Sequence, residues 1–180
     1  PADKPDSPLE LLDLLQVREL ASIQEAIPVA MRDGTLLSAN LIVPNGASAD
    51  SRRPVIMIQS PYAPAKELGI PLEKAVLTRL IREGYVVAIV NVRGTQWSEG
   101  EYHWMKGARQ DGLDTLQWIT EQPWSNGKVG ALGCSSSGEV TIPLATANPP
   151  ALKAVVAMAA ATGVGEIPGF SDQGDFYMGG

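Results

Sequence analysis

The chain has 180 residues, of which 44% are hydrophobic and 19% charged, a composition typical of a folded domain with a hydrophobic core. The net charge of −6 argues against nucleic-acid binding and against docking on anionic membranes. No apolar run approaches the ~20 residues that span a bilayer. One cysteine and one histidine exclude an internal disulfide and argue against a His/Cys metal site. We therefore expect no metal, no cofactor, no nucleic-acid partner and no membrane span.

The first residues, Pro1 to Pro8, are polar and rich in proline, and the chain does not begin with methionine. Such a start is compatible with a mature end after signal removal or with a trimmed N-terminus. We expect secretion or periplasmic export, with a cytoplasmic location as the alternative. Leucines at helical spacing over residues 9–20 predict an amphipathic helix, and we interpret residues 1–22 as a leader helix with its linker.

Residues 23–160 are predicted to form a hairpin followed by alternating strands and helices. Apolar alternation predicts strands over 27–31 and 37–43, joined at Asp33-Gly34, a dipeptide typical of hairpin turns. Continuous apolar strands are predicted over 54–60, 85–91, 129–132 and 152–157. Helices are predicted over 72–82, 108–121 and 136–147, and we expect Pro143 to bend or shorten the last of these.

Apolar strands separated by helices are typical of a mostly parallel sheet covered on both faces, so the fold class is α/β. We assign residues 23–160 to the N-terminal part of one domain. The glycine-rich residues 161–180 then begin a further region or end the chain. The last predicted strand is followed by a loop where a covering helix is expected, which indicates an incomplete architecture.

The segment from Gly127 to Gly138 carries the strongest functional signal. A short apolar strand ends in glycine, a serine follows, and a helix begins, in the order Gly133-Cys134-Ser135-Ser136-Ser137-Gly138. A strand, a sharp turn and a helix with small residues around a serine are typical of a nucleophile elbow. The pattern predicts a serine hydrolase with Ser135 as its nucleophile.

The two following serines leave other assignments open. If Ser136 were the nucleophile, Cys134 would stand where a glycine belongs, and Ser137 would already lie within the helix. The hydroxyl groups of both serines are equally explained as caps for free helix N–H groups. Cys134 is most simply a small buried residue.

Six short motifs occur in a fixed order along the chain. They are Met31-Arg32-Asp33-Gly34, Gln59-Ser60-Pro61-Tyr62, Val92-Arg93-Gly94-Thr95 running into Ser98-Glu99-Gly100-Glu101, Asp114-Thr115-Leu116-Gln117-Trp118-Ile119, Glu121-Gln122-Pro123-Trp124-Ser125-Asn126-Gly127, and the elbow. In this order and spacing they resemble the cocaine esterase, α-amino acid ester hydrolase and X-prolyl dipeptidyl-peptidase family of α/β-hydrolases. The resemblance covers roughly residues 25–160 and implies an α/β-hydrolase fold.

The resemblance implies three site residues. Ser135 matches the family nucleophile, Tyr62 matches a phenolic oxyanion-hole donor, and the backbone N–H of Ser136 is the second donor. Tyr62 has an alternative reading as an aromatic side chain packed at the end of a strand. Two positions depart from the family pattern. Ser136 replaces the elbow tyrosine but keeps the backbone N–H. Gln96 replaces a glycine in the loop after Arg93-Gly94, so we expect this loop to be less tightly turned.

A serine nucleophile needs a base that takes its proton and an acid that orients the base. His103 precedes the serine, whereas α/β-hydrolases follow the order serine, acid, histidine. Asp172 and Asp175 follow the last strand, but the family places a cap insertion before the acid. Glu139, one turn beyond Ser135, is read as a solvated or pocket-wall carboxylate.

The resemblance therefore implies that the cap, the last strands, the acid, the histidine and a C-terminal β-sandwich lie on a second polypeptide or on a C-terminal segment outside these residues. The predicted function is hydrolysis of an ester or amide (an acyl ester, an amino-acid ester or a peptide-like substrate) through an acyl-enzyme on Ser135. The alternatives are a non-catalytic α/β-hydrolase-like subunit that binds a partner, and an acyltransferase that uses the same acyl-enzyme.

Overall fold

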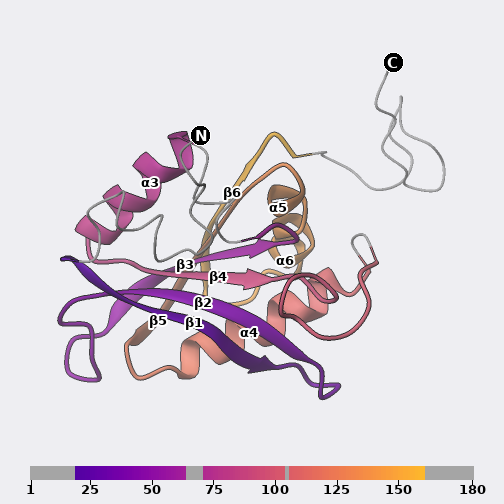
Figure 1. Cartoon of the computed structure of the whole chain (residues 1–180), viewed down its shortest axis with the longest axis horizontal. Helices are drawn as coiled ribbons and strands as arrows, with labels where there is room; N and C mark the ends of the chain where they lie inside the picture. Colours follow the sequence, from indigo (N-terminus) through magenta and orange to yellow (C-terminus); the bar gives the residue numbers. More distant parts are fainter. Residues whose placement is uncertain (1–18, 64–70, 104–105, 161–180) are drawn as a thin grey trace, which may run out of the picture.

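The structure is a computed structural model that describes residues 19–63, 71–103 and 106–160, with one six-stranded sheet between helices (Figure 1). The predicted leader helix over 9–20 falls almost entirely outside these residues. The candidate acids Asp172 and Asp175 also lie outside them.

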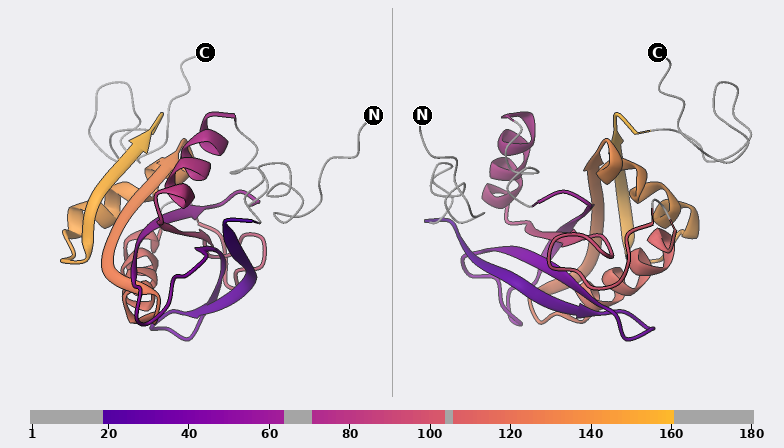
Figure 2. Two further views of the ribbon diagram at one scale, coloured as in Figure 1. Left: turned by 90° about the vertical axis from the view of Figure 1, so that its left-hand side faces the viewer. Right: turned by 45° about the vertical axis from the view of Figure 1, so that its right-hand side comes forward.

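The sheet has the strand order β1-β2-β4-β3-β5-β6. Its strands are β1 (Ala21–Ala30), β2 (Leu36–Pro44), β3 (Arg53–Ser60), β4 (Val86–Asn91), β5 (Ser125–Cys134) and β6 (Leu152–Met158). β2 runs antiparallel to β1 and β4, and the pairs β3–β4, β3–β5 and β5–β6 are parallel. Figure 2 shows the β1–β2 hairpin and β6 at opposite edges of the twisted sheet.

The helices cover both faces of the sheet. They are α3 (Pro71–Arg82), α4 (Ala108–Glu121), α5 (Ser136–Glu139) and α6 (Thr141–Ala147). Leu77 and Ile81 of α3 pack in one buried cluster, whereas Leu116 of α4 and Leu144 of α6 pack in another. Successive residues of a strand point to opposite faces, and along β4 the side chains alternate between these two clusters. The prediction of a mostly parallel sheet covered by helices is confirmed.

The predicted hairpin turn is present between β1 and β2. Gly34 has φ 86°, a left-handed conformation that glycine adopts without steric cost. The Met31 N–H donates to the Thr35 carbonyl at 2.9 Å, and the Thr35 N–H donates to the Asp33 carboxylate at 3.0 Å. The turn therefore places the Asp33 carboxylate beyond the strand ends.

The helix predicted over 136–147 is divided into α5 and α6 at Val140. Proline lacks an N–H, and its ring clashes with the carbonyl four residues earlier in a helix. For Pro143 that carbonyl belongs to Glu139, the last residue of α5. The break expected from Pro143 is confirmed, and it leaves α5 as a single turn after Ser135.

β6 lies at an edge of the sheet and, among the described residues, pairs with β5 alone. Val156 on this strand is 48% exposed. In the described part of the chain, no helix combines the length and the apolar character that crossing a membrane requires.

Candidate active site

Ser135 lies at the turn between β5 and α5, with φ 57° and ψ −130°. A positive φ is uncommon for residues other than glycine and is a mark of strained functional turns. The Ser135 N–H donates to the Met158 carbonyl of β6 at 2.9 Å, and the Ser135 carbonyl accepts from the Glu139 N–H at 2.9 Å. With its backbone held at both ends, Ser135 remains exposed at the surface.

Two glycines allow the strand and the helix to approach each other. A Cβ on Gly133 would lie 2.2 Å from the Ser137 carbonyl oxygen, and one on Gly138 would lie 2.9 Å from the Met158 carbonyl oxygen. Neither position can hold a side chain without moving the backbone. The structure therefore has the geometry of the predicted elbow, with small residues where close contact requires them.

Tyr62 lies two residues beyond the end of β3, the strand that neighbours β5. Parallel neighbours present their carboxyl ends at the same edge of a sheet. Two buried hydroxyl oxygens join the segments, because Ser137 Oγ donates to Ser60 Oγ at 3.1 Å. The structure thus brings the Tyr62 segment against the elbow helix, as the assignment of both to one site requires.

Ser136 begins α5, and the first N–H groups of a helix have no acceptor within the helix. Such N–H groups form a ready site for negative charge. The Ser136 hydroxyl points elsewhere, since it donates to the Glu139 carboxylate at 3.3 Å. The Ser136 hydroxyl is therefore engaged by Glu139, whereas the Ser136 backbone lies at the start of α5.

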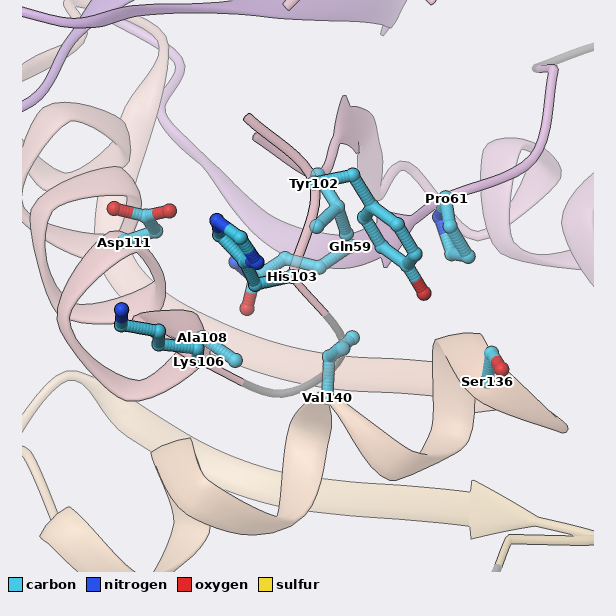
Figure 3. Close-up of a pocket in the computed structure, with 10 residues that line it drawn as sticks. Gln59, Pro61, Tyr102, His103, Lys106, Ala108, Asp111, Ser136 and Val140 are labelled. Carbon is cyan, nitrogen blue, oxygen red and sulfur yellow. The ribbon is translucent and has the colours of Figure 1, made fainter. Parts of the chain in front are cut away.

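A small pocket lies beside the elbow helix. Figure 3 shows Ser136 at one end of it and His103, Lys106 and Asp111 at the other, with the Tyr102 ring between His103 and Pro61. Its lining residues are Gln59, Pro61, Val92, Tyr102, His103, Lys106, Ala108, Asp111, Ser136 and Val140. The free volume of about 10 Å³ holds about one water molecule.

Tyr102 is the aromatic wall of this pocket. Tyr102 is 44% exposed, and its partial burial, followed by the charges of Tyr62 and Glu139, raises its pKa above the usual value. A tyrosine phenol is neutral at physiological pH even without this shift, so Tyr102 can donate a hydrogen bond.

Arg93 joins three segments behind the pocket. Its guanidinium donates to both oxygens of the buried Asp111 of α4, at 2.7 and 3.0 Å. It also lies 2.8 Å from the Asp33 carboxylate and donates to the Thr35 hydroxyl at 2.6 Å. Hydrogen bonding to Asp111 raises the pKa of Arg93, so this side chain stays charged. Bidentate pairs of this kind fix geometry as well as charge.

A second pair ties the hairpin turn to α4. Arg32 donates to Asp114 through its guanidinium, at 2.6 Å, and through its backbone N–H, at 3.0 Å. Burial opposes ionisation of Asp114, but the hydrogen bonds from Arg32 outweigh it and lower the pKa of this carboxyl group. The Thr35 N–H, followed by Arg93, lowers the pKa of Asp33 to about 2. Sequence reasoning noted these residues as motif positions and missed their pairing.

The expectation that the loop after Arg93 is less tightly turned, because Gln96 replaces a glycine, is wrong. The Gln96 φ of 51° is left-handed, as a glycine at this position would allow. The Thr95 N–H donates to the Val92 carbonyl at 3.0 Å, and the Ser98 N–H donates to the Thr95 carbonyl at 2.9 Å. The loop after Arg93 is therefore tightly turned despite the loss of glycine, because these hydrogen bonds hold Gln96 in a conformation that side chains rarely adopt.

His103 lies in the pocket wall and contacts the Glu101 carboxylate at 3.3 Å. Its side chain is 56% exposed, and in Figure 3 it lies at the end opposite Ser136. Cys134 is a free, half-buried thiol. Within the ranges that the structure describes, no cluster of three His, Cys, Asp or Glu side chains could hold a metal ion.

Comparison with known proteins places this arrangement in a family. The family described as X-Pro dipeptidyl-peptidase (S15 family) matches residues 33–174. The chain belongs to the S15 family. The α/β-hydrolase fold and the family resemblance predicted from the motifs are thereby confirmed.

Three similar proteins illustrate the relationship. The cocaine esterase of Rhodococcus sp. (strain MB1 Bresler) is 31% identical over 153 residues, which are 85% of this chain and 26% of that protein. A solved α-amino acid ester hydrolase is 28% identical, with a TM-score of 0.68 over 78% of this chain and 25% of that one. An aminopeptidase from a marine sediment Thaumarchaeota archaeon is 27% identical, with a TM-score of 0.67 over 89% of this chain and 28% of that one. The chain thus spans about a quarter of the length of these relatives.

Proposed function

We propose that these residues form the nucleophile side of a serine hydrolase that cleaves an ester or amide through an acyl-enzyme on Ser135. The observation that carries the proposal is the backbone of Ser135, which has φ 57° between Gly133 and the first turn of α5. A strained turn of this kind presents the serine oxygen at the top of the sheet, where a substrate carbonyl can reach it. Membership of the S15 family supports the same chemistry.

In this proposal two donors stabilise the charge that develops on the substrate oxygen. One is the Ser136 N–H at the start of α5, and the other is the phenol of Tyr62 from the neighbouring strand end. Donors aimed at the transition state typically contribute about 2.7–4 kcal/mol each. The adjacency of the two segments, shown by the contact between Ser60 and Ser137, supports their assignment to one oxyanion hole.

The general base and its orienting acid then come from a second polypeptide or a C-terminal segment outside these residues. His103 is the single histidine of the sequence, and among the described residues its recorded polar contact is with Glu101. A base must come within hydrogen-bond reach of the serine hydroxyl. The substrate class that we propose is an acyl ester, an amino-acid ester or a peptide-like amide, as the names of the relatives suggest.

Hydrolysis of p-nitrophenyl acetate by the complete active protein tests this proposal. Ser135→Ala should reduce turnover to the uncatalysed background, because no other hydroxyl takes its place. Ser136→Ala is the matched comparison, since it removes the neighbouring hydroxyl but keeps the backbone N–H, and it should lose no more than about tenfold. Activity that survives Ser135→Ala, or that disappears only in Ser136→Ala, would contradict the assignment of Ser135.

A further inference from the structure

A buried hydroxyl pair connects the elbow helix to the segment that carries Tyr62. Ser60 ends β3 and Ser137 is the second residue of α5, and both are fully buried. Ser137 Oγ donates to Ser60 Oγ at 3.1 Å across 77 residues of sequence. Burying a hydroxyl group is unfavourable unless it is hydrogen-bonded. The pair is therefore a specific contact between two segments that meet only in the folded chain.

The same oxygen of Ser60 also holds the backbone of Tyr62. The Tyr62 N–H donates to Ser60 Oγ at 3.0 Å. One atom, Ser60 Oγ, thus lies within hydrogen-bond distance of both the Ser137 hydroxyl and the Tyr62 N–H. Ser137 directly follows Ser136, so this atom bridges the two segments that supply the proposed oxyanion donors.

Asn91 holds the other side of the Tyr62 peptide. Its Nδ2 donates to the Tyr62 carbonyl at 2.9 Å and lies 3.4 Å from the Ser60 carbonyl. Two acceptors face this atom, so it must be the amide nitrogen and not the oxygen. Asn91 is fully buried at the end of β4. Buried side chains therefore hold both the N–H and the carbonyl of Tyr62.

We propose that Ser60 and Ser137 are positioning residues that set the distance between the two oxyanion-hole donors. The Ser60–Ser137 hydrogen bond fixes the Tyr62 segment relative to the first turn of α5. An oxyanion donor is effective only within a narrow range of distance from the charge that develops. The inference rests on the proposed function, because it assigns Tyr62 and the Ser136 N–H to one hole.

The test compares two buried hydroxyl groups near the elbow. Ser137→Ala removes the hydroxyl that reaches Ser60. Thr141→Val is the matched control, because the Thr141 hydroxyl is equally buried but donates to the nearby Gly138 carbonyl at 2.6 Å. Both variants should lower the melting temperature to a similar extent. With p-nitrophenyl acetate, Ser137→Ala should lower kcat by about 10- to 100-fold with little change in KM, whereas Thr141→Val should stay within about twofold.

A double variant separates positioning from general destabilisation. If Ser137 acts by placing the Tyr62 phenol, then Ser137→Ala should cost less than about threefold once Tyr62→Phe has removed that phenol. Ser60→Ala, which removes the other hydroxyl, should show the same dependence on Tyr62. Losses that multiply in the double variants, or equal losses in Ser137→Ala and Thr141→Val, would overturn the inference.

Turnover that does not depend on Ser135 contradicts the proposed function itself. Turnover that depends on Ser135 but is unchanged by both Ser60→Ala and Ser137→Ala contradicts the positioning role alone.

Discussion

Gly133→Ala tests the elbow geometry most severely, because the new methyl group would meet only backbone. The added Cβ would lie 2.2 Å from the Ser137 carbonyl oxygen, 2.3 Å from the Ser137 carbonyl carbon and 2.6 Å from the Gly138 nitrogen. Ordinary contacts begin near 3.4 Å, so β5 and α5 would have to separate by about 1 Å. Overpacking of a rigid site costs about 1–3 kcal/mol and occasionally more, and we expect the upper end here.

The separation should also displace Ser135, which lies between the two elements. A misplacement of about 1 Å can cost about 100-fold in rate, so labelling of Ser135 by a fluorophosphonate probe should slow by about that factor. Gly130→Ala is the control in the same strand, because its Cβ would lie 3.1 Å from Ile56 Cδ1, the end of a flexible side chain. It should cost about 1 kcal/mol or less and label normally. Urea unfolding and labelling time courses measure both effects, and a Gly133→Ala protein with normal stability and labelling would refute the reasoning.

Three further predictions concern the site and its supporting network. Tyr62→Phe should lower kcat by about 10²–10³-fold with little change in stability, since it removes one donor and no bulk; unchanged turnover would mean that Tyr62 only packs. His103→Ala should keep turnover within about tenfold, whereas a loss of several thousandfold would make His103 the base. The folded state lowers the pKa values of Asp33 and Asp114, so their ionised carboxylates stabilise the fold above the pKa values that they have in the unfolded chain. This stabilisation is lost when the carboxylates are protonated, so the free energy of unfolding should fall between about pH 4 and pH 2. Urea titrations across that range measure this loss. Asp114→Asn should make the free energy of unfolding depend less on pH, and an unchanged pH dependence in that variant would contradict the assignment of part of the loss to Asp114.

Local patterns predicted most of the fold because each relevant signal lies within a few residues. The helix over 108–121 was predicted with its observed bounds, and the break in the elbow helix follows from Pro143 and the carbonyl of Glu139. β5 was predicted only over 129–132, although it begins at Ser125. Its first residues are polar and glycine-containing, so no hydrophobic pattern marks them. These residues belong to the strand because Ser125 pairs with Arg53 of the neighbouring strand β3.

The candidate site was predicted less completely, because its contacts join distant parts of the sequence. The strained serine turn is a local pattern and was recognised as such. The pairing of Arg93 with Asp111 and of Ser60 with Ser137 depends on which strand ends meet. A sequence without an alignment carries no signal for such pairs, since each residue alone reads as an ordinary polar side chain. The tight turn at Gln96 is a different case, because the hydrogen bonds that hold it, from Thr95 to Val92 and from Ser98 to Thr95, are local but are not marked by a glycine in the sequence.

The most direct test of the central claim is to map the site of covalent modification. The complete active protein is treated with a fluorophosphonate probe, digested, and analysed by peptide mass spectrometry. The account predicts a single modified serine, Ser135, within the peptide that also contains Ser136 and Ser137, and no modification in Ser135→Ala. Modification of Ser136 or Ser137, or labelling that persists in Ser135→Ala, would contradict it.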